Sequence, residues 1–433
     1  MGFLAILVIV YILKWEVTGI DRKNYNFLFI FAGVLFIAAF IFNTPKEIVE
    51  GNIIILKSPC NLITDYFKIA NIGAALMNAS LMAFISIFLL MFCHVTLNGS
   101  YIAAIFTIVG FSLFGKNIYN SIPIILGVFI YAKLHRYKFK ECLLSALFGT
   151  ALGPLVSEIT FNLNLPFYIG VPLGILSGIF VGLILPPLSE HFKSFHKGYN
   201  LYNIGFTCGI IGTFVIALLR SFNVEVDTVY LISKGNNEPL IYLLSFLFLV
   251  MFLWGLALNK WSLRGYYRLL NGSDITNKDY IILFGSGLTL INMSFLGIIA
   301  VLYVLLVGGQ LSGPVIGGIF TVAGFGAYGK NLKNVSPIIL GVFLSSFFTL
   351  HDINSTTILL AALFGTTLAP ISQAYGPIFG IIAGGIHVSM VVNISYMHAG
   401  MNLYNNGFSG GFVAATLVPL IDTFTHHRMR KML

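Results

Sequence analysis

The polar residues best suited to bind a solute occur twice in this chain. Residues 105–129 and 319–343 are identical at 16 of 25 aligned positions, shifted by 214 residues. Each copy carries a threonine, a glycine–lysine–asparagine turn and a proline. An ammonium selects by charge, an amide offers hydrogen bonds, glycine allows close approach and proline breaks a helix. The candidate pore residues are Thr107, Gly115, Lys116, Asn117, Pro123, Thr321, Gly329, Lys330, Asn331 and Pro337.

A plainer interpretation of this block is a helix–loop–helix turn. Each asparagine would then cap a helix, each lysine would extend to the membrane interface, and each threonine would bond a carbonyl of its own helix. Retention in both copies indicates that both copies use these residues, but it does not indicate their role.

A second polar block, His-x-Gly-x-Asn-Leu-Tyr-Asn-x-Gly-Phe, covers residues 196–206 and recurs at 398–408. Its polar groups stand at the start of the last helix of each copy. There they either line a vestibule or cap that helix and satisfy its backbone. The candidate secondary lining residues are His196, Asn200, Tyr202, Asn203, His398, Asn402, Tyr404 and Asn405.

Other site chemistries find no support in the sequence. The four cysteines have no metal-ligand spacing, and the chain contains no P-loop, His-Glu-x-x-His or Ser/His/Asp arrangement. Glu158 has no acidic counterpart in the second copy. We therefore predict no enzyme activity, catalytic site, metal site, cofactor or nucleic-acid partner. The lack of a repeated carboxylate favours passive permeation over proton or sodium coupling.

Composition places the chain in a membrane. Hydrophobic residues make up 58% of its 433 positions, charged residues make up 9%, and the mean hydropathy is +0.92. A soluble domain carries roughly 25% charged residues. Several apolar runs approach or exceed the ~20 residues that span hydrocarbon. The net charge of +9 sits in short clusters beside these runs, which is typical of topogenic loops.

Each copy should contain about seven apolar segments. Because an odd number of membrane crossings ends on the opposite side from where it began, the second copy should be inverted relative to the first. Even numbers of segments separate the basic loops 14–23, 133–140 and 260–268 and the C-terminus. All four therefore face one side, which the positive-inside rule makes cytoplasmic, in a multi-pass protein of the cell membrane. Segments 101–114 and 311–328 are short and glycine-rich, so they either span or re-enter.

The expected fold is an all-α polytopic membrane protein of two inverted repeats, with short or re-entrant broken helices at the repeat interface. Its parts are an N-terminal short apolar segment and basic loop (1–24), repeat 1 (25–222), a linker (223–237), repeat 2 (238–424) and a basic tail (425–433). Residues 2–13 read as a retained segment, because they lack a basic start and a cleavage site.

The runs from Gly115 to Gly127 and from Gly329 to Gly341, with the Leu-Phe-Gly-Thr blocks that follow, resemble the urea transporter family. The resemblance implies inverted halves around a central pore, often in trimers. The same fold is similar to membrane subunits of sodium-pumping oxidoreductases. Lys116 and Lys330 stand where that family has uncharged residues, so its urea-lining residues are not transferred. As a whole, the chain resembles an uncharacterised family of bacterial and archaeal multi-pass membrane proteins.

These features predict a channel-like transporter that passes a small polar solute between the two lysine turns. The expected partners are the lipid bilayer and that solute, with a homodimer or homotrimer as the oligomers to consider. The alternative is a membrane-embedded subunit of a larger redox or scaffold complex, whose interior would be packed shut.

Overall fold

The computed structural model describes residues 19–226, 228–272, 278–348 and 350–432. Within these ranges the secondary structure is helical, and ten helices are long and apolar enough to cross a membrane. The prediction of an all-α, multi-pass membrane protein is confirmed. The apolar run 2–13 and the first part of the basic loop 14–23 lie outside the described residues.

The two halves of the chain contain similar successions of helices, which differ in a few short elements. The first half consists of α2 (Gly19–Phe42), α3 (Pro45–Lys57), α4 (Tyr66–Ile69), α5 (Ile72–Phe92), α6 (Gly99–Phe111), α7 (Ile118–Leu134), α8 (Phe139–Gly149), η1 (Thr150–Leu152), α9 (Gly153–Phe161), α10 (Phe167–Lys193) and α11 (Asn203–Ser221). The second half consists of α12 (Asn237–Leu258), α13 (Tyr266–Asn271), α14 (Tyr280–Leu306), α15 (Gly313–Gly324), η2 (Phe325–Ala327), α16 (Leu332–Ser346), α17 (Thr356–Gly365), η3 (Thr366–Leu368), α18 (Ala369–Tyr375), α19 (Pro377–His398) and α20 (Asn405–Met432). The two successions differ in the short elements α3, α4, α13 and η2.

Helices α6 and α15 are too short to cross a membrane alone. They have 13 and 12 residues, or about 20 and 18 Å at 1.5 Å per residue, against a hydrocarbon core of ~30 Å. Tyr101, at the start of α6, donates a hydrogen bond to the carbonyl of Lys140, the second residue of α8 (3.3 Å). The start of α6 therefore lies beside the start of α8.

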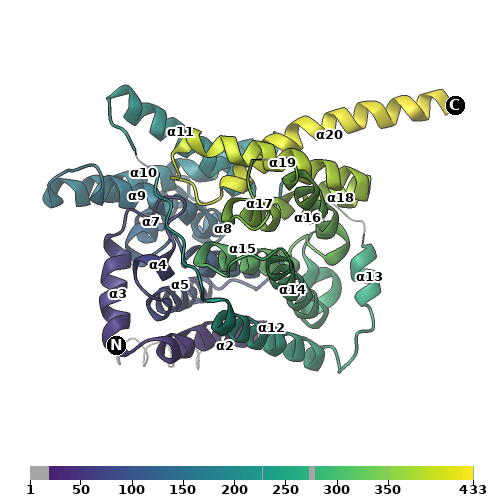
Figure 1. Ribbon diagram of the computed structural model, residues 1–433, viewed down its shortest axis with the longest axis horizontal. Helices are drawn as coiled ribbons and strands as arrows, with labels where there is room; N and C mark the ends of the chain where they lie inside the picture. The colour runs from purple at the N-terminus through teal and green to yellow at the C-terminus, as the bar shows by residue number, and fades with distance from the viewer. Residues whose placement is uncertain (1–18, 227, 273–277, 349, 433) are drawn as a thin grey trace.

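Helices α6 and α15 pack antiparallel in the middle of the molecule, where Figure 1 shows α15 between α2 and α12 below and α19 and α20 above. Gly110, near the end of α6, meets Gly317, near the start of α15. A Cβ added at Gly110 would lie 2.6 Å from the carbonyl oxygen of Gly317. At the other end, Gly324 of α15 packs against Phe106 of α6. Glycine at these positions permits the close approach.

Each of these central helices is capped by an aspartate from the other half. Asp279 accepts a hydrogen bond from the backbone N–H of Gly99, the first residue of α6 (2.9 Å). Asp65 accepts from the backbone N–H of Gly313, the first residue of α15 (3.2 Å). The two aspartates and the two glycines are each 214 residues apart. A carboxylate at a helix N-terminus satisfies free N–H groups and complements the helix dipole.

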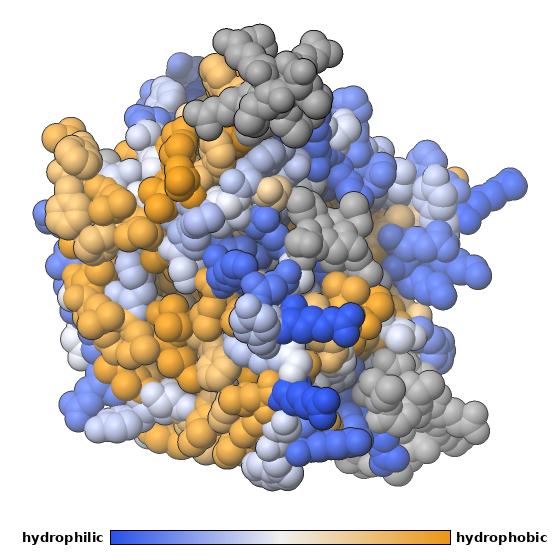
Figure 2. Space-filling view, turned by 90° about the vertical axis from the view of Figure 1, so that its right-hand side faces the viewer, coloured by the Kyte–Doolittle hydropathy of each residue, from blue (hydrophilic) through white to orange (hydrophobic). Residues whose placement is uncertain are grey.

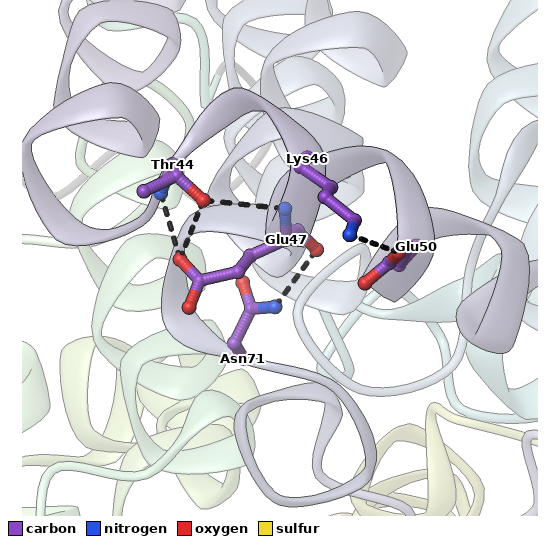
Figure 3. A network of polar contacts seen from close by, with 5 residues as sticks. All are labelled: Thr44, Lys46, Glu47, Glu50 and Asn71. Atoms are coloured by element: carbon purple, nitrogen blue, oxygen red, sulfur yellow. Dashed lines mark hydrogen bonds and ion pairs between the residues drawn. The ribbon is translucent and has the colours of Figure 1, made fainter.

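Helix α3 packs against the start of α5 and begins with a capping box. The Glu47 carboxylate accepts from the backbone N–H of Thr44 (2.8 Å) and from its hydroxyl (2.9 Å), while the Thr44 hydroxyl accepts from the Glu47 N–H, as Figure 3 shows. These hydrogen bonds lower the pKa of Glu47. The Asn71 amide ties this turn to α5 by donating to the Glu47 carbonyl (3.0 Å).

Removing this cap should loosen α3 without unfolding the protein. Thr44→Ala is expected to cost about 1 kcal/mol in local stability, and Thr44→Ser should retain the cap. Because the pKa of Glu47 is lowered, the contribution of its carboxylate is present near neutral pH and is lost as the pH falls through that pKa. Hydrogen exchange of the α3 amides measures the effect. Equal exchange in wild type and both variants would contradict it.

The surface carries the apolar area that lipid contact requires. Figure 2 shows a broad hydrophobic region on one face beside a zone where hydrophilic residues gather. Large apolar side chains such as Phe214, Leu306 and Ile378 are exposed on the candidate spans. A soluble monomer rarely exposes so much contiguous apolar surface.

Candidate functional site

The two repeated lysines lie in the interior of the protein. Both side chains are fully buried. The alternative in which they reach the membrane interface therefore does not hold. Neither ammonium is ion-paired within the described part of the chain. Buried lysines without a carboxylate partner are rare because an unpaired charge is costly to desolvate, so they mark this region as a candidate functional site.

The two lysines differ in their contacts. Lys330 Nζ donates to the Tyr202 hydroxyl (2.5 Å) and to Thr366 Oγ1 (2.7 Å). It also lies 5.1 Å from the centre of the Phe325 ring. Lys116 Nζ lies 5.3 Å from the centre of the Phe111 ring but has no hydrogen-bond partner among the described residues.

Six aromatic side chains surround the lysines and form what we call the central aromatic cluster: Phe111, Phe148, Tyr202, Phe325, Phe364 and Tyr404. They pair across the two halves. Phe111 meets Tyr404 (4.6 Å between ring centres), and Phe325 meets Tyr202 (4.7 Å). Tyr202 and Tyr404 lie 5.1 Å apart at the middle of the cluster. These separations are those of favourable aromatic pairs, so the cluster is closely packed.

The Gly-Lys-Asn turns are held by amides from neighbouring helices. Asn78 of α5 donates to the carbonyls of Ser112 and Lys116 (2.7 Å each). Asn292 of α14 makes the equivalent bonds to Gly326 and Lys330 (2.8 Å each). The backbone of each lysine is therefore fixed, and its side chain is directed by this anchored turn.

The other residues of the turns have structural partners. Asn117 and Asn331 cap α7 and α16, and their amides bond backbone or Tyr280 groups. Thr107 and Thr321 donate to carbonyls of their own helices. Gly329 has a positive φ of 84°, and Gly115 packs against Leu403. Pro123 and Pro337 lie inside α7 and α16, where they pack against Gly178 and Gly380.

The second polar block links the two halves. Asn200 donates to the carbonyl of Gly407 (2.9 Å), and Asn402 donates to that of Gly205 (3.1 Å). Leu201 N–H bonds the carbonyl of Thr367 in η3, and Leu403 N–H bonds that of Ala151 in η1. The 3₁₀ turns η1 and η3 interrupt the helical hydrogen bonding between α8 and α9 and between α17 and α18. At each interruption a backbone carbonyl therefore accepts a hydrogen bond from the other half. This exchange also brings Tyr202 and Tyr404 into the central aromatic cluster.

Each histidine of the second polar block forms a hydrogen bond with an asparagine of the same copy of the block. His196 Nε2 pairs with Asn203 Oδ1 (2.9 Å), and His398 Nε2 pairs with Asn405 Oδ1 (3.0 Å). The asparagine amides then donate to the ends of α10 and α19, at Ser189 and Val391. The two histidines therefore position the turns that carry Tyr202 and Tyr404.

Two cavities of about 240 Å³ each approach the central aromatic cluster. The first is lined by Ser100, Lys193, Asn203, Tyr328, Tyr202 and Tyr404 among others. The second is lined by Phe114, Thr228, His351, Asn405, Leu403 and Phe364 among others. Ser100 lies at the start of α6 and Phe114 follows its end, so the cavities lie at opposite ends of α6. Asn203 in the first cavity and Asn405 in the second stand at the same position of the repeated polar block.

Sequence reasoning did not single out Asp65, Asp279, Asn78 or Asn292. Each pair is 214 residues apart, and Asp-Tyr recurs at 65–66 and 279–280. Carrying the repeat alignment upstream from residues 105 and 319 would have found them. The six rings could not be found in this way, because phenylalanine and tyrosine are common throughout the chain.

Residues 44–221 and 258–423 match a family described as "Protein of unknown function (DUF1576)". No curated protein and no solved structure matches the chain. The resemblance to urea transporters is therefore not confirmed, whereas the expected membership of an uncharacterised family is. Because the two matched regions cover more than three quarters of the 433 residues, the chain belongs to the DUF1576 family.

Proposed function

We propose that this protein is a channel-like membrane transporter that passes a small polar solute through a path between its two halves, without converting it chemically. The observation that carries the proposal is the pair of cavities that approach one buried cluster from opposite ends. A solute path needs an opening on each side and a selective centre. The central aromatic cluster, with its two lysines, would be that centre.

We infer that the two halves are inverted relative to each other, an arrangement that would support this path. Contacts are exchanged reciprocally, as in Asn200 to Gly407 and Asn402 to Gly205. Helices α6 and α15 are antiparallel. Transporters built from inverted repeats bind their solute where broken helices of the two repeats meet. Here the breaks at η1 and η3 both adjoin the central aromatic cluster.

The first cavity would open to the cytoplasm. It lies at the end of the molecule where α8 begins, beside the basic loop 133–140. The start of α14 lies at this end as well, because Asp279 caps α6 there. The positive-inside rule assigns such basic loops to the cytoplasmic face.

The alternative is a membrane-embedded subunit of a larger complex. One observation favours it, namely that the aromatic rings close the centre between the two cavities. A closed centre also fits a transporter in its resting conformation. Permeability measurements therefore decide between the two.

Stopped-flow osmotic measurements on proteoliposomes test the proposal. Urea, small amides, glycerol, formate and ammonium are offered in turn, and the double variant Lys116→Ala/Lys330→Ala is measured in parallel. We expect permeability to one class of solute well above that of empty liposomes, and a loss of selectivity in the double variant. Folded wild-type protein that conducts none of these solutes would refute a passive path for them and favour the complex-subunit alternative.

A further inference from the structure

We propose that Lys116 and Tyr404 form a binding site for one small monovalent anion inside the central aromatic cluster. The inference rests on the proposed function, because it names the solute class for the same path. It begins with a difference between two equivalent sets of residues.

In the second half the lysine is satisfied by the protein. Lys330 bonds the hydroxyls of Tyr202 and Thr366, at 2.5 and 2.7 Å. The equivalent groups in the first half are Lys116, Tyr404 and Thr150. Among the described residues, Lys116 Nζ and Tyr404 Oη are both buried and have no hydrogen-bond partner. Thr150 Oγ1 donates to the carbonyl of Leu147 just as Thr366 Oγ1 donates to that of Leu363 (2.6 Å each), but only Thr366 also accepts from a lysine. Two buried polar groups that bond in one half are therefore left open in the other.

The chemistry of these open groups selects an anion. An ammonium has donors only, and a phenolic hydroxyl has a donor to offer. Thr107 lies close to Tyr404, but its hydroxyl donates to the carbonyl of Ala103 (2.7 Å) and so has no proton to donate to Tyr404 Oη. Cys208 is the other polar neighbour of Lys116. A ligand with acceptors and a single negative charge would satisfy both groups and neutralise the buried ammonium.

The first cavity gives this site an entrance. Tyr404 lines that cavity, together with Tyr202 and Phe148 of the same cluster. Lys193 and Glu190 also line this cavity, so an anion that enters from this end passes Lys193 before it reaches Tyr404. Aromatic walls exclude large hydrated ions, which limits the ligand to a small one.

Nitrate binding to the purified full-length protein tests the site. The thermal unfolding midpoint is measured in detergent as sodium nitrate replaces sodium gluconate at constant ionic strength. We expect a saturable rise for wild type, as for any ligand that binds the folded state. Lys116→Met should abolish the rise. Tyr404→Phe, which keeps the ring, should weaken the apparent affinity about tenfold.

Lys133→Ala is the matched control, because it removes an ammonium that lies over a surface phenylalanine ring at the end of α7. It should respond to nitrate as wild type does. A rise that does not saturate, or one that Lys116→Met and Tyr404→Phe leave intact, would overturn the anion site. Failure of the proposed transport function would give a different result. Nitrate binding that requires Lys116, in protein that shows no solute permeability, would support the anion site and refute the transport function. Solute permeability without nitrate binding would support the transport function and refute the anion site.

Discussion

Replacing Lys116 with methionine is expected to raise the thermal stability of the protein while it removes anion-selective permeability. The ammonium of Lys116 is buried, has no hydrogen-bond partner among the described residues, and is not ion-paired there. Methionine fills a similar volume and needs no partner. Because the variant no longer buries an unpaired charge, its free energy of unfolding should be higher by about 2 kcal/mol or more. A group kept at such a cost is expected to serve function.

The matched variant is Lys330→Met, at the equivalent position of the other half. It loses the hydrogen bonds to Tyr202 and Thr366 and leaves their hydroxyls buried. It should therefore be no more stable than wild type. Unfolding midpoints in nitrate-free buffer and stopped-flow permeability in liposomes measure the two effects. Equal midpoints for both variants would show that the difference between the lysines is not energetic, and unchanged permeability in Lys116→Met would remove Lys116 from the path.

Much of the fold follows from local sequence. Within the described residues, each predicted apolar segment coincides with a helix or, at Phe139–Phe161 and Thr356–Tyr375, with two helices joined by a 3₁₀ turn. The apolar runs are long, and their ends carry glycine, proline or asparagine. Asn117 and Asn331 start their helices because their side chains can accept the free N–H groups of the first turn. The short central helices were recognisable from their glycines, such as Gly110 and Gly317, which mark close backbone approach.

The candidate site depends on contacts that local sequence does not encode. Lys330 meets Tyr202 across 128 residues, and Asn200 reaches Gly407 across 207. Such contacts arise only when the two halves pack together. The sequence also does not predict that Lys330 has hydrogen-bond partners and Lys116 has none, since both lysines stand in the same sequence context. That difference lies in side-chain geometry, and only the folded centre reveals it.

Asp65→Ala is expected to destabilise the protein more than the loss of any other helix cap. The Asp65 carboxylate is fully buried and accepts from the N–H groups of Phe67, Ser233 and Gly313 and from the Ser233 hydroxyl (2.6–3.2 Å). It thereby joins α4, the linker between the halves and the start of α15. Alanine would leave four buried donors without their acceptor, at a cost of about 3–5 kcal/mol.

Asp279→Ala tests the same role in the other half. Its carboxylate accepts from Gly99, Ile281 and Ile282, and its side chain is more exposed than that of Asp65 (7% against 0%). Its loss should therefore cost less than that of Asp65. Asp352→Ala, in an exposed loop, should leave the unfolding midpoint unchanged. Size-exclusion profiles and unfolding midpoints in detergent give the ranking. If Asp65→Ala were as stable as Asp352→Ala, the aspartate caps would not hold the central helices, and the antiparallel pairing of α6 and α15 would rest on their glycine contacts alone.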